Sequence, residues 1–246
     1  MLPYIKTPFG DIATFVIMIA FGLIAFFCIL HKKLEKDYIE ESFIIPKVVC
    51  SMMVAYIGAG VVDSLFKMGA NGSFIISGIT FYGGLIFGVA SMWLQLLFYT
   101  NKTKYSKKEW FDILTVPFVT FHMCGRIGCF FAGCCYGKVT TSLCGIKFPD
   151  NIEAGIYHYG EKCYPTQLFE AFFLLIILIV VLQAKKKFFT YITLYAVIRF
   201  FIEFFRGDER GGIFPFLSPA QTISAAILLI VMICKLMIIC QINEKE

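Results

Sequence analysis

The sequence places an arginine, Arg126, inside a stretch that is apolar enough to cross a membrane. The stretch begins at Phe111 and continues into GRIGCFFAGCCYG, residues Gly125 to Gly137. A guanidinium within a bilayer is costly unless a polar or anionic partner meets it, and such a residue generally marks a functional site. Arg126 is therefore the first candidate for binding an anionic substrate.

A second group of residues with useful chemistry follows a helical spacing in a later apolar stretch. Four residues stand at positions i, i+4, i+8 and i+11: Tyr195, Arg199, Glu203 and Arg206. This spacing places them on one face of an α-helix, and Glu203 can pair with Arg199 and hold it in one orientation. Arginine matches phosphate oxygens in a two-point contact, and phosphate at a membrane surface belongs mostly to phospholipids. The arginines therefore predict a lipid-phosphate site.

His122 is the first candidate for a general base. It lies one turn before Arg126 and shares a helix face with Arg126 and Cys129. An imidazole can exchange a proton near neutral pH. Tyr82 and Glu170 are the other candidates for this role. A structural role, in which His122 only forms a hydrogen bond within the protein, stays open.

Further substrate contacts are expected near the same ends of the helices. The expected residues are Gly83, Gly84, Gly125, Cys129, Cys134, Gly137, Gln167, Glu170, Tyr195 and Arg206. The glycines let a ligand approach the backbone, but they can also serve close helix packing, which is the preferred interpretation for Gly84 and Gly88. The charges have a structural interpretation as well, because the three arginines could be neutralised by Asp63, Glu170 and Glu203.

Composition and hydropathy predict the elements that position these residues. The chain is 59% hydrophobic and 16% charged, which excludes an ordinary soluble protein. Seven runs are long enough to span a bilayer: Ile12 to Leu30, Val48 to Leu65, Phe74 to Tyr99, Phe111 to Cys129, Leu168 to Gln183, Phe188 to Phe205 and Ala220 to Cys240. The predicted fold is an all-α integral membrane protein with seven transmembrane helices. Residues 1–246 are expected to form a single membrane domain.

Lysine and arginine in the connections predict the orientation. Eleven lysines follow the first, third and fifth runs, including Lys32, Lys104 and Lys185, and short cytoplasmic connections collect such residues. The N-terminus is therefore expected outside, the C-terminus in the cytoplasm and the arginine site near the outer leaflet. The first run lacks a basic flank and a small-residue cleavage site, so we expect a retained helix rather than a removed signal peptide.

Five cysteines fall on the predicted outer side: Cys129, Cys134, Cys135, Cys144 and Cys163. Thiols in an oxidising space favour disulfides, with Cys144 and Cys163 best placed to join each other or Cys134 and Cys135. No metal site and no cofactor are expected, because neither CxxC nor HxxxH spacing is present near them. A nucleophilic or redox-active Cys129, activated by its basic neighbours, is an alternative.

Five motifs in order resemble the phosphatidylglycerol:prolipoprotein diacylglyceryl transferase family over nearly the whole chain. They are YGGL (Tyr82 to Leu85), GRIGCFFAGCCYGK (Gly125 to Lys138), GIKFP (Gly145 to Pro149), YPTQLFEA (Tyr164 to Ala171) and YAVIRFFIEFFRGD (Tyr195 to Asp208). The resemblance implies a bacterial plasma-membrane enzyme. Such an enzyme transfers the diacylglyceryl group of phosphatidylglycerol to the lipobox cysteine of a prolipoprotein, forming a thioether and releasing glycerol phosphate.

The resemblance also implies roles for single residues. Arg126 would contact the lipid phosphate or glycerol, and Arg199 with Glu203 would complete that pocket. Tyr195 matches a functionally important tyrosine of the family. Gly137 and the adjoining Tyr136 would shape the mouth through which the signal peptide of the prolipoprotein enters.

The chain departs from the family pattern at several positions. Tyr82 stands where the family typically has a histidine, and Cys129, Ala132 and Cys134 replace two asparagines and an acid. Two alternatives to the implied reaction stay open: a related enzyme that moves a lipid group to another acceptor, and a non-catalytic phospholipid-binding or transport protein. Transport is less favoured, because a transport path carries polar residues through the membrane and the inner helix halves here are nearly all apolar. The expected partners are phosphatidylglycerol, the signal peptide with its lipobox cysteine and membrane lipids, but no nucleic acid.

Overall fold

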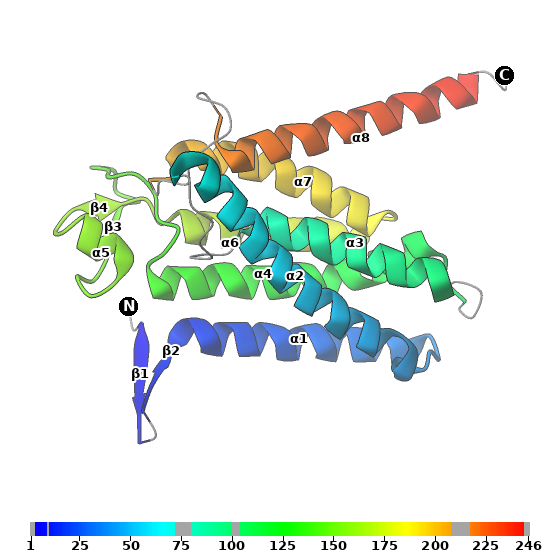
Figure 1. The fold of residues 1–246 in the computed structure, drawn as a ribbon, viewed down its shortest axis with the longest axis horizontal. Helices are drawn as coiled ribbons and strands as arrows, with labels where there is room; N and C mark the ends of the chain where they lie inside the picture. Colours follow the sequence, from blue (N-terminus) through cyan, green and yellow to red (C-terminus); the bar gives the residue numbers. More distant parts are fainter. Residues whose placement is uncertain (1–2, 9, 72–79, 100–103, 208–216, 244–246) are drawn as a thin grey trace. The chain divides into compact units, whose positions relative to one another are not determined.

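The computed structural model describes residues 3–8, 10–71, 80–99, 104–207 and 217–243. The described chain is mostly helical, and six of its helices are long and apolar enough to cross a membrane. Its elements in chain order are β1 (Tyr4–Thr7), β2 (Gly10–Ala13), α1 (Thr14–Lys36), α2 (Glu41–Asn71), α3 (Phe81–Tyr99), α4 (Lys107–Ala132), β3 (Ile146–Lys147), α5 (Glu153–Tyr157), β4 (Lys162–Cys163), α6 (Thr166–Gln183), α7 (Lys187–Ile202), the 3-10 turn η2 (Glu203–Phe205) and α8 (Pro219–Asn243) (Figure 1).

Each of the seven predicted apolar runs lies in a helix, but the helix ends differ from the prediction. The first helix begins at Thr14, because Ile12 pairs with Ile5 in the antiparallel hairpin of β1 and β2. The second begins at Glu41, so Lys47 is a helical residue whose Nζ donates to the Phe43 carbonyl at 2.6 Å. Residues 74–79 of the third run lie outside the described residues. The described apolar part of α8, Pro219–Cys234, is shorter than the other six spans.

Tertiary packing divides the chain into two compact units. The first unit comprises Met1–Cys28, Thr115–Glu209 and Ser224–Glu246, and the second comprises Ile29–Leu114 and Arg210–Ile223. In the second unit α2 packs against α3 through glycines. A Cβ on Gly84 would lie 3.3 Å from the Ala55 carbonyl oxygen, and one on Gly88 would lie 3.1 Å from the Ala55 Cβ. The predicted packing role of Gly84 and Gly88 is confirmed.

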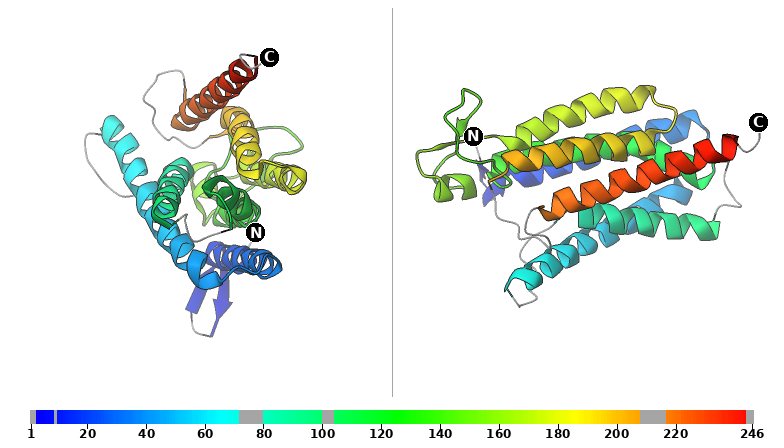
Figure 2. Two further views of the ribbon diagram at one scale, coloured as in Figure 1. Left: turned by 90° about the vertical axis from the view of Figure 1, so that its right-hand side faces the viewer. Right: turned by 90° about the horizontal axis from the view of Figure 1, so that it is seen from above.

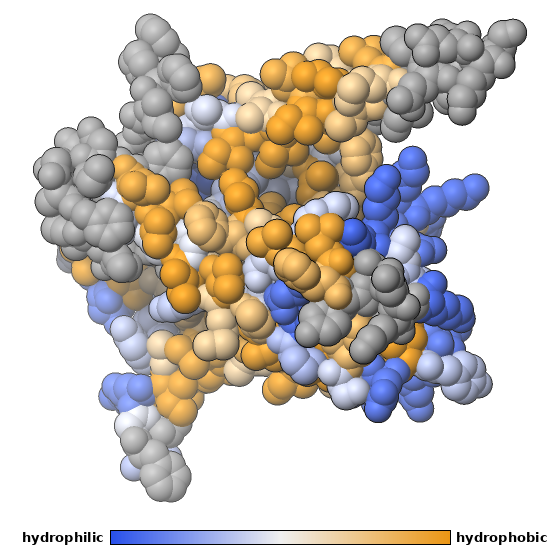
Figure 3. Space-filling view, turned by 45° about the vertical axis from the view of Figure 1, so that its right-hand side comes forward, coloured by the Kyte–Doolittle hydropathy of each residue, from blue (hydrophilic) through white to orange (hydrophobic). Residues whose placement is uncertain are grey.

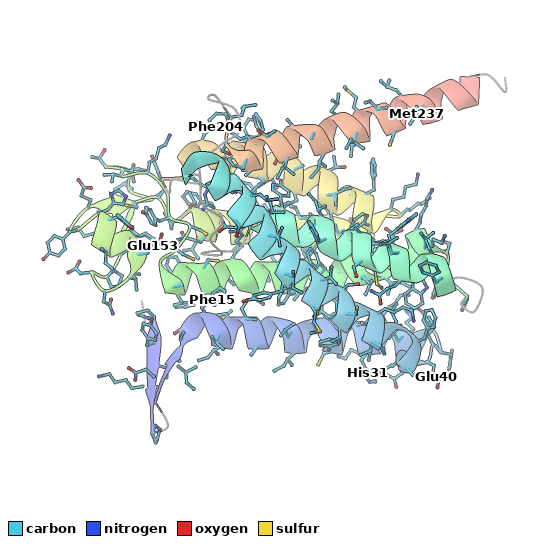
Figure 4. All side chains as sticks on the ribbon, in the orientation of Figure 1. Phe15, His31, Glu40, Glu153, Phe204 and Met237 are labelled. Carbon is cyan, nitrogen blue, oxygen red and sulfur yellow. The ribbon has the colours of Figure 1, made fainter. Side chains whose placement is uncertain are left out.

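In the first unit, α4 lies between α1 on one side and α6 with α7 on the other (Figure 2). Small residues allow the close approach of α1 and α4. A Cβ on Gly22 would lie 3.0 Å from the Cys124 Cβ, and one on Gly128 would lie 3.1 Å from Phe15, which is labelled in Figure 4. This face of α4 is used for packing, so the opposite face carries the polar residues.

The segment between α4 and α6 folds over the ends of these two helices (Figure 1). It contains β3, α5 and β4 and has an apolar core of its own, formed by Tyr136, Phe148, Ile152, Ala154 and Cys163. The segment starts at Gly133, which has a φ of +70°, a left-handed conformation that glycine adopts at little cost. Hydropathy predicted this segment only as a connection, but it is an ordered cover.

Hydrophobic side chains make up much of the surface that Figure 3 shows. On α1 the exposed fractions of Phe21 and Ile24 are 60% and 62%, and on α6 that of Phe172 is 59%. A soluble monomer rarely exposes contiguous apolar surface on this scale. The outward faces of the helices are therefore suited to lipid.

Candidate active site

A buried ion pair joins α4 to α6 in the first unit. The Nε of Arg126 lies 2.9 Å from Oε1 of Glu170, and both side chains are almost fully buried. The hydroxyl of Tyr195 on α7 donates to the same carboxylate oxygen at 2.7 Å. A single carboxylate therefore links three helices, and it fixes the guanidinium of Arg126 in one orientation.

His122 lies one turn before this pair and is buried among aromatic rings. Its Nδ1 is 3.2 Å from the hydroxyl of Tyr191, and its Nε2 is 3.9 Å from Oε1 of Glu170. The ring of Tyr195 packs edge-on against the imidazole, with 4.9 Å between centroids. The histidine is thus held by a tyrosine on one side and faces a carboxylate on the other.

Tyr191 is a residue of this cluster that sequence reasoning missed. Its ring stacks on Tyr195 at 5.7 Å and its side chain is fully buried. The signal was present in the sequence, because Tyr191 stands one turn before Tyr195 on the same face of α7. The polar stripe of α7 therefore begins one turn earlier than predicted, at Tyr191, whereas Glu203 and Arg206 lie beyond the end of the helix.

A second charged group lies where α7 ends. The Nη1 of Arg199 is 2.5 Å from Oε2 of Glu203, which confirms the predicted pairing. The Nε of Arg206 is 3.7 Å from the same oxygen. Arg199 stands one turn after Tyr195 on α7, and Tyr195 contacts Glu170, so the two groups of charges are neighbours.

The two groups together hold three buried guanidiniums, those of Arg126, Arg199 and Arg206. They pair with the carboxylates of Glu170 and Glu203. The interpretation that the charges neutralise one another is therefore confirmed for these two acids. Asp63, the third acid of that interpretation, belongs to the second unit. Guanidiniums held in fixed positions are also suited to bind an anion such as phosphate.

Side chains of α6 and backbone of η2 hold the covering segment in place. Gln167 donates to the carbonyl of Cys134 at 2.7 Å, and Thr166 donates to that of Cys135 at 2.7 Å. Gly137 pairs with Arg206 in an isolated antiparallel bridge. A Cβ on Gly137 would lie 2.6 Å from the Tyr164 Cβ, so only glycine fits this contact. Gln167 and Gly137 thus hold the backbone that borders the site.

Three thiols come together where α4 passes into the covering segment. The sulfur atoms of Cys129, Cys134 and Cys135 all lie within 4.8 Å of one another. Hydrogen bonds with the thiols of Cys129 and Cys135, followed by burial, raise the pKa of the Cys134 thiol. Cys135 was not among the expected site residues.

The predicted disulfide between Cys144 and Cys163 is absent. Both residues are free thiols. Cys163 belongs to the apolar core of the covering segment, whereas Cys144 is exposed. The prediction was wrong because a shared place in the outer connection does not decide which side of the segment a cysteine faces.

The remaining expected site residues are Gly125 on α4 and three residues of α3. A Cβ on Gly125 would lie 3.9 Å from Ile19, so this glycine faces α1. Tyr82, Gly83 and Gly84 belong to α3 in the second unit, where Tyr82 is buried and a Cβ on Gly83 would lie 2.7 Å from the Val62 Cβ on α2. The first unit by itself contains the other expected residues.

The sequence model of the prolipoprotein diacylglyceryl transferase family matches residues 4–239. The chain belongs to this family. The match extends across both units and ends within α8. The structure therefore describes a membrane protein of this transferase family, with a buried arginine cluster in its first unit.

Similar proteins carry the family's name. A phosphatidylglycerol–prolipoprotein diacylglyceryl transferase of Clostridium tetani is 30% identical over 232 residues, which are 84% of this chain and 85% of the relative. The protein named phosphatidylglycerol–prolipoprotein diacylglyceryl transferase 2 of Clostridium perfringens is 36% identical over 160 residues, or 62% of this chain and 59% of the relative. A relative of the same name from Chlorobaculum tepidum is 35% identical over 159 residues, 60% of this chain and 52% of the relative.

Proposed function

We propose that the protein transfers the diacylglyceryl group of phosphatidylglycerol to the lipobox cysteine of a prolipoprotein. The observation that carries the proposal is the buried cluster of three guanidiniums and two carboxylates in a chain of this family. Its guanidiniums can bind the oxygens of a phosphodiester in a two-point contact. The relatives' names supply the reaction.

The arginines stabilise the phosphate while its charge increases. The acceptor thiol loses its proton, and its sulfur forms a bond to the terminal glyceryl carbon of the lipid. The bond from that carbon to the phosphate oxygen breaks, and glycerol phosphate leaves with the electron pair. Its negative charge rises in the step, so guanidiniums fixed in a dry site lower the barrier. Glu170 fixes Arg126, and Glu203 fixes Arg199.

His122 is the general base that we propose takes the proton from the acceptor thiol. It lies beside the arginine that binds phosphate, Tyr191 holds its Nδ1, and Glu170 stands near its Nε2. A carboxylate near the imidazole stabilises the imidazolium that forms when the proton arrives. Tyr82, Gly83 and Gly84 on α3 stay predicted lipid contacts, and Gly137 would border the entry of the signal peptide.

The proposed setting is the bacterial plasma membrane, with the site near the outer leaflet. The helix α8 would form a seventh span, because its 25 residues measure about 37 Å at 1.5 Å per residue. The lysine-rich connections support an outside N-terminus and a cytoplasmic C-terminus. Residues 1–246 would act as one transferase domain, since the family match extends across both units.

The test is to incubate the purified protein with phosphatidylglycerol and a lipobox peptide and to measure the diacylglyceryl thioether by mass spectrometry. Arg126→Lys keeps the charge but removes the two-point contact, and kcat should fall on the order of 100-fold, as on losing one oxyanion donor. The exposed Lys147→Ala is the matched control on the same unit.

If wild-type protein gives no thioether in an assay where an active family member does, the proposal fails. A labelled Cys129 adduct would instead favour the enzyme with another acceptor, and bound lipid without turnover would favour a binding protein.

A further inference from the structure

The three-thiol cluster at the end of α4 is not used by the proposed reaction. Cys129 lies in the last turn of α4, and Cys134 and Cys135 follow Gly133. Their three sulfur atoms lie within 4.8 Å of one another, and all three residues are half-buried. The cluster therefore lies at a partly exposed place in the protein.

The backbone that brings the sulfurs together is firmly held. Gly133 has a φ of +70° and Cys135 a φ of +64°, and the second value is uncommon for a residue with a side chain. Gln167 and Thr166 bind the carbonyls of Cys134 and Cys135 at 2.7 Å each. The strained turn is thus fixed by two hydrogen bonds from α6. Sites that hold a ligand in a defined geometry need this kind of support.

We propose that Cys129, Cys134 and Cys135 bind one thiophilic divalent metal ion, with Zn²⁺ as the representative. Tetrahedral zinc with Zn–S bonds of about 2.3 Å places its sulfurs about 3.8 Å apart. The sulfurs here need to approach by about 1 Å at most, which small rotations of the side chains supply. As the ion binds, each thiol releases its proton to solvent, and the fourth ligand position stays open to water.

The donor set selects the class of ion. Thiolates favour zinc and related soft ions, whereas magnesium and calcium need oxygen ligands. A disulfide is the rival state of such a cluster. It would join two sulfurs at about 2.05 Å and leave the third unused, whereas one metal ion engages all three sulfurs.

The test is a metal-binding measurement on the full chain, purified in detergent under reducing and anaerobic conditions. Equilibrium dialysis against Zn²⁺ should give one ion per chain, and Cd²⁺ should produce the ultraviolet charge-transfer band of cadmium thiolate. Cys129→Ser, Cys134→Ser and Cys135→Ser should each weaken Zn²⁺ binding roughly tenfold or more. Cys144→Ser is the matched control, because it removes an exposed thiol outside the cluster and should leave binding unchanged.

Two results would overturn the site. One is Zn²⁺ binding that survives in the variant with all three cysteines replaced by serine. The other is reduced wild-type protein that binds no more Zn²⁺ than this triple variant, whether or not two of the thiols form a disulfide in air. The thermal unfolding temperature of each metal-free variant shows whether it is folded, and added Zn²⁺ should raise this temperature only where the three thiols are intact. None of these readouts requires transferase activity.

Discussion

Two neighbouring groups of buried charge in the first unit are built in opposite ways. Around Glu170, one carboxylate receives a guanidinium from α4 and a hydroxyl from α7, so the contact joins three helices. Around Glu203, one carboxylate lies between Arg199 and Arg206, which are four and three residues away in the chain. The first group depends on the tertiary fold, whereas the second is local to one helix end. The difference predicts which group supports stability and which is better placed to respond to a ligand.

The largest effect is expected from Glu170→Gln. This change leaves the Arg126 guanidinium buried without its ionic partner and should lower the free energy of unfolding by about 3–5 kcal/mol. Glu203→Gln should cost less, because the chain itself keeps Arg199 and Arg206 near the end of α7, whereas Glu170 joins separate helices. Denaturant unfolding in detergent measures both, with the exposed Glu161→Gln as control. Equal losses for the two buried variants would abolish the contrast between the groups.

The two tyrosines of α7 divide the first group further. Tyr195→Phe removes a hydrogen bond to the Glu170 carboxylate and should cost about 1.5–3 kcal/mol, whereas Tyr191→Phe removes a neutral contact with His122 and should cost about 0.5–1.5 kcal/mol. Each variant loses one hydroxyl oxygen. Their free energies of unfolding in denaturant can therefore be compared directly. Tyr191→Phe should also shift the pH profile of activity, since the lost hydroxyl lies beside the Nδ1 of the proposed base. The opposite order of stabilities would show that Glu170 does not depend on Tyr195.

Gly137→Ala tests the second group through its backbone. The added Cβ would lie 2.6 Å from the Tyr164 Cβ and 2.7 Å from the Phe205 carbonyl oxygen, so the bridge to Arg206 must shift. A loss of about 1–3 kcal/mol is expected, as for other overpacked sites. A thermal shift in detergent would measure it. Unchanged stability would mean that the bridge at Arg206 adapts without cost.

Gly125→Ala is the matched change with the smallest expected effect. Its new Cβ would meet only Ile19, at 3.9 Å among the described atoms. Alanine is preferred over glycine inside a helix by up to about 1 kcal/mol, so the melting temperature should stay constant or rise slightly. A clear fall would show that α1 and α4 pack more tightly at this point than the distance indicates.

Much of the helical fold could be predicted from the sequence, because apolar runs longer than a bilayer is thick have few other stable conformations. The helix ends could not, since pairing in the hairpin of β1 and β2 moved one of them to Thr14. The short strands and the apolar core of the covering segment were also missed. Their residues come from short, irregular stretches without a clear period.

For the candidate site, the sequence by itself determined the contacts that lie within one helix. The helical repeat brings Arg199 close to Glu203, and the same repeat places Tyr191 one turn before Tyr195. Only the tertiary structure decided that Glu170 meets Arg126 and Tyr195, because those residues lie on three helices that no local rule aligns. It also decided that three cysteines without metal-ligand spacing converge, because left-handed residues at Gly133 and Cys135 turn the chain back on itself. Periodicity sets the contacts along a helix, whereas packing and turns set those between segments.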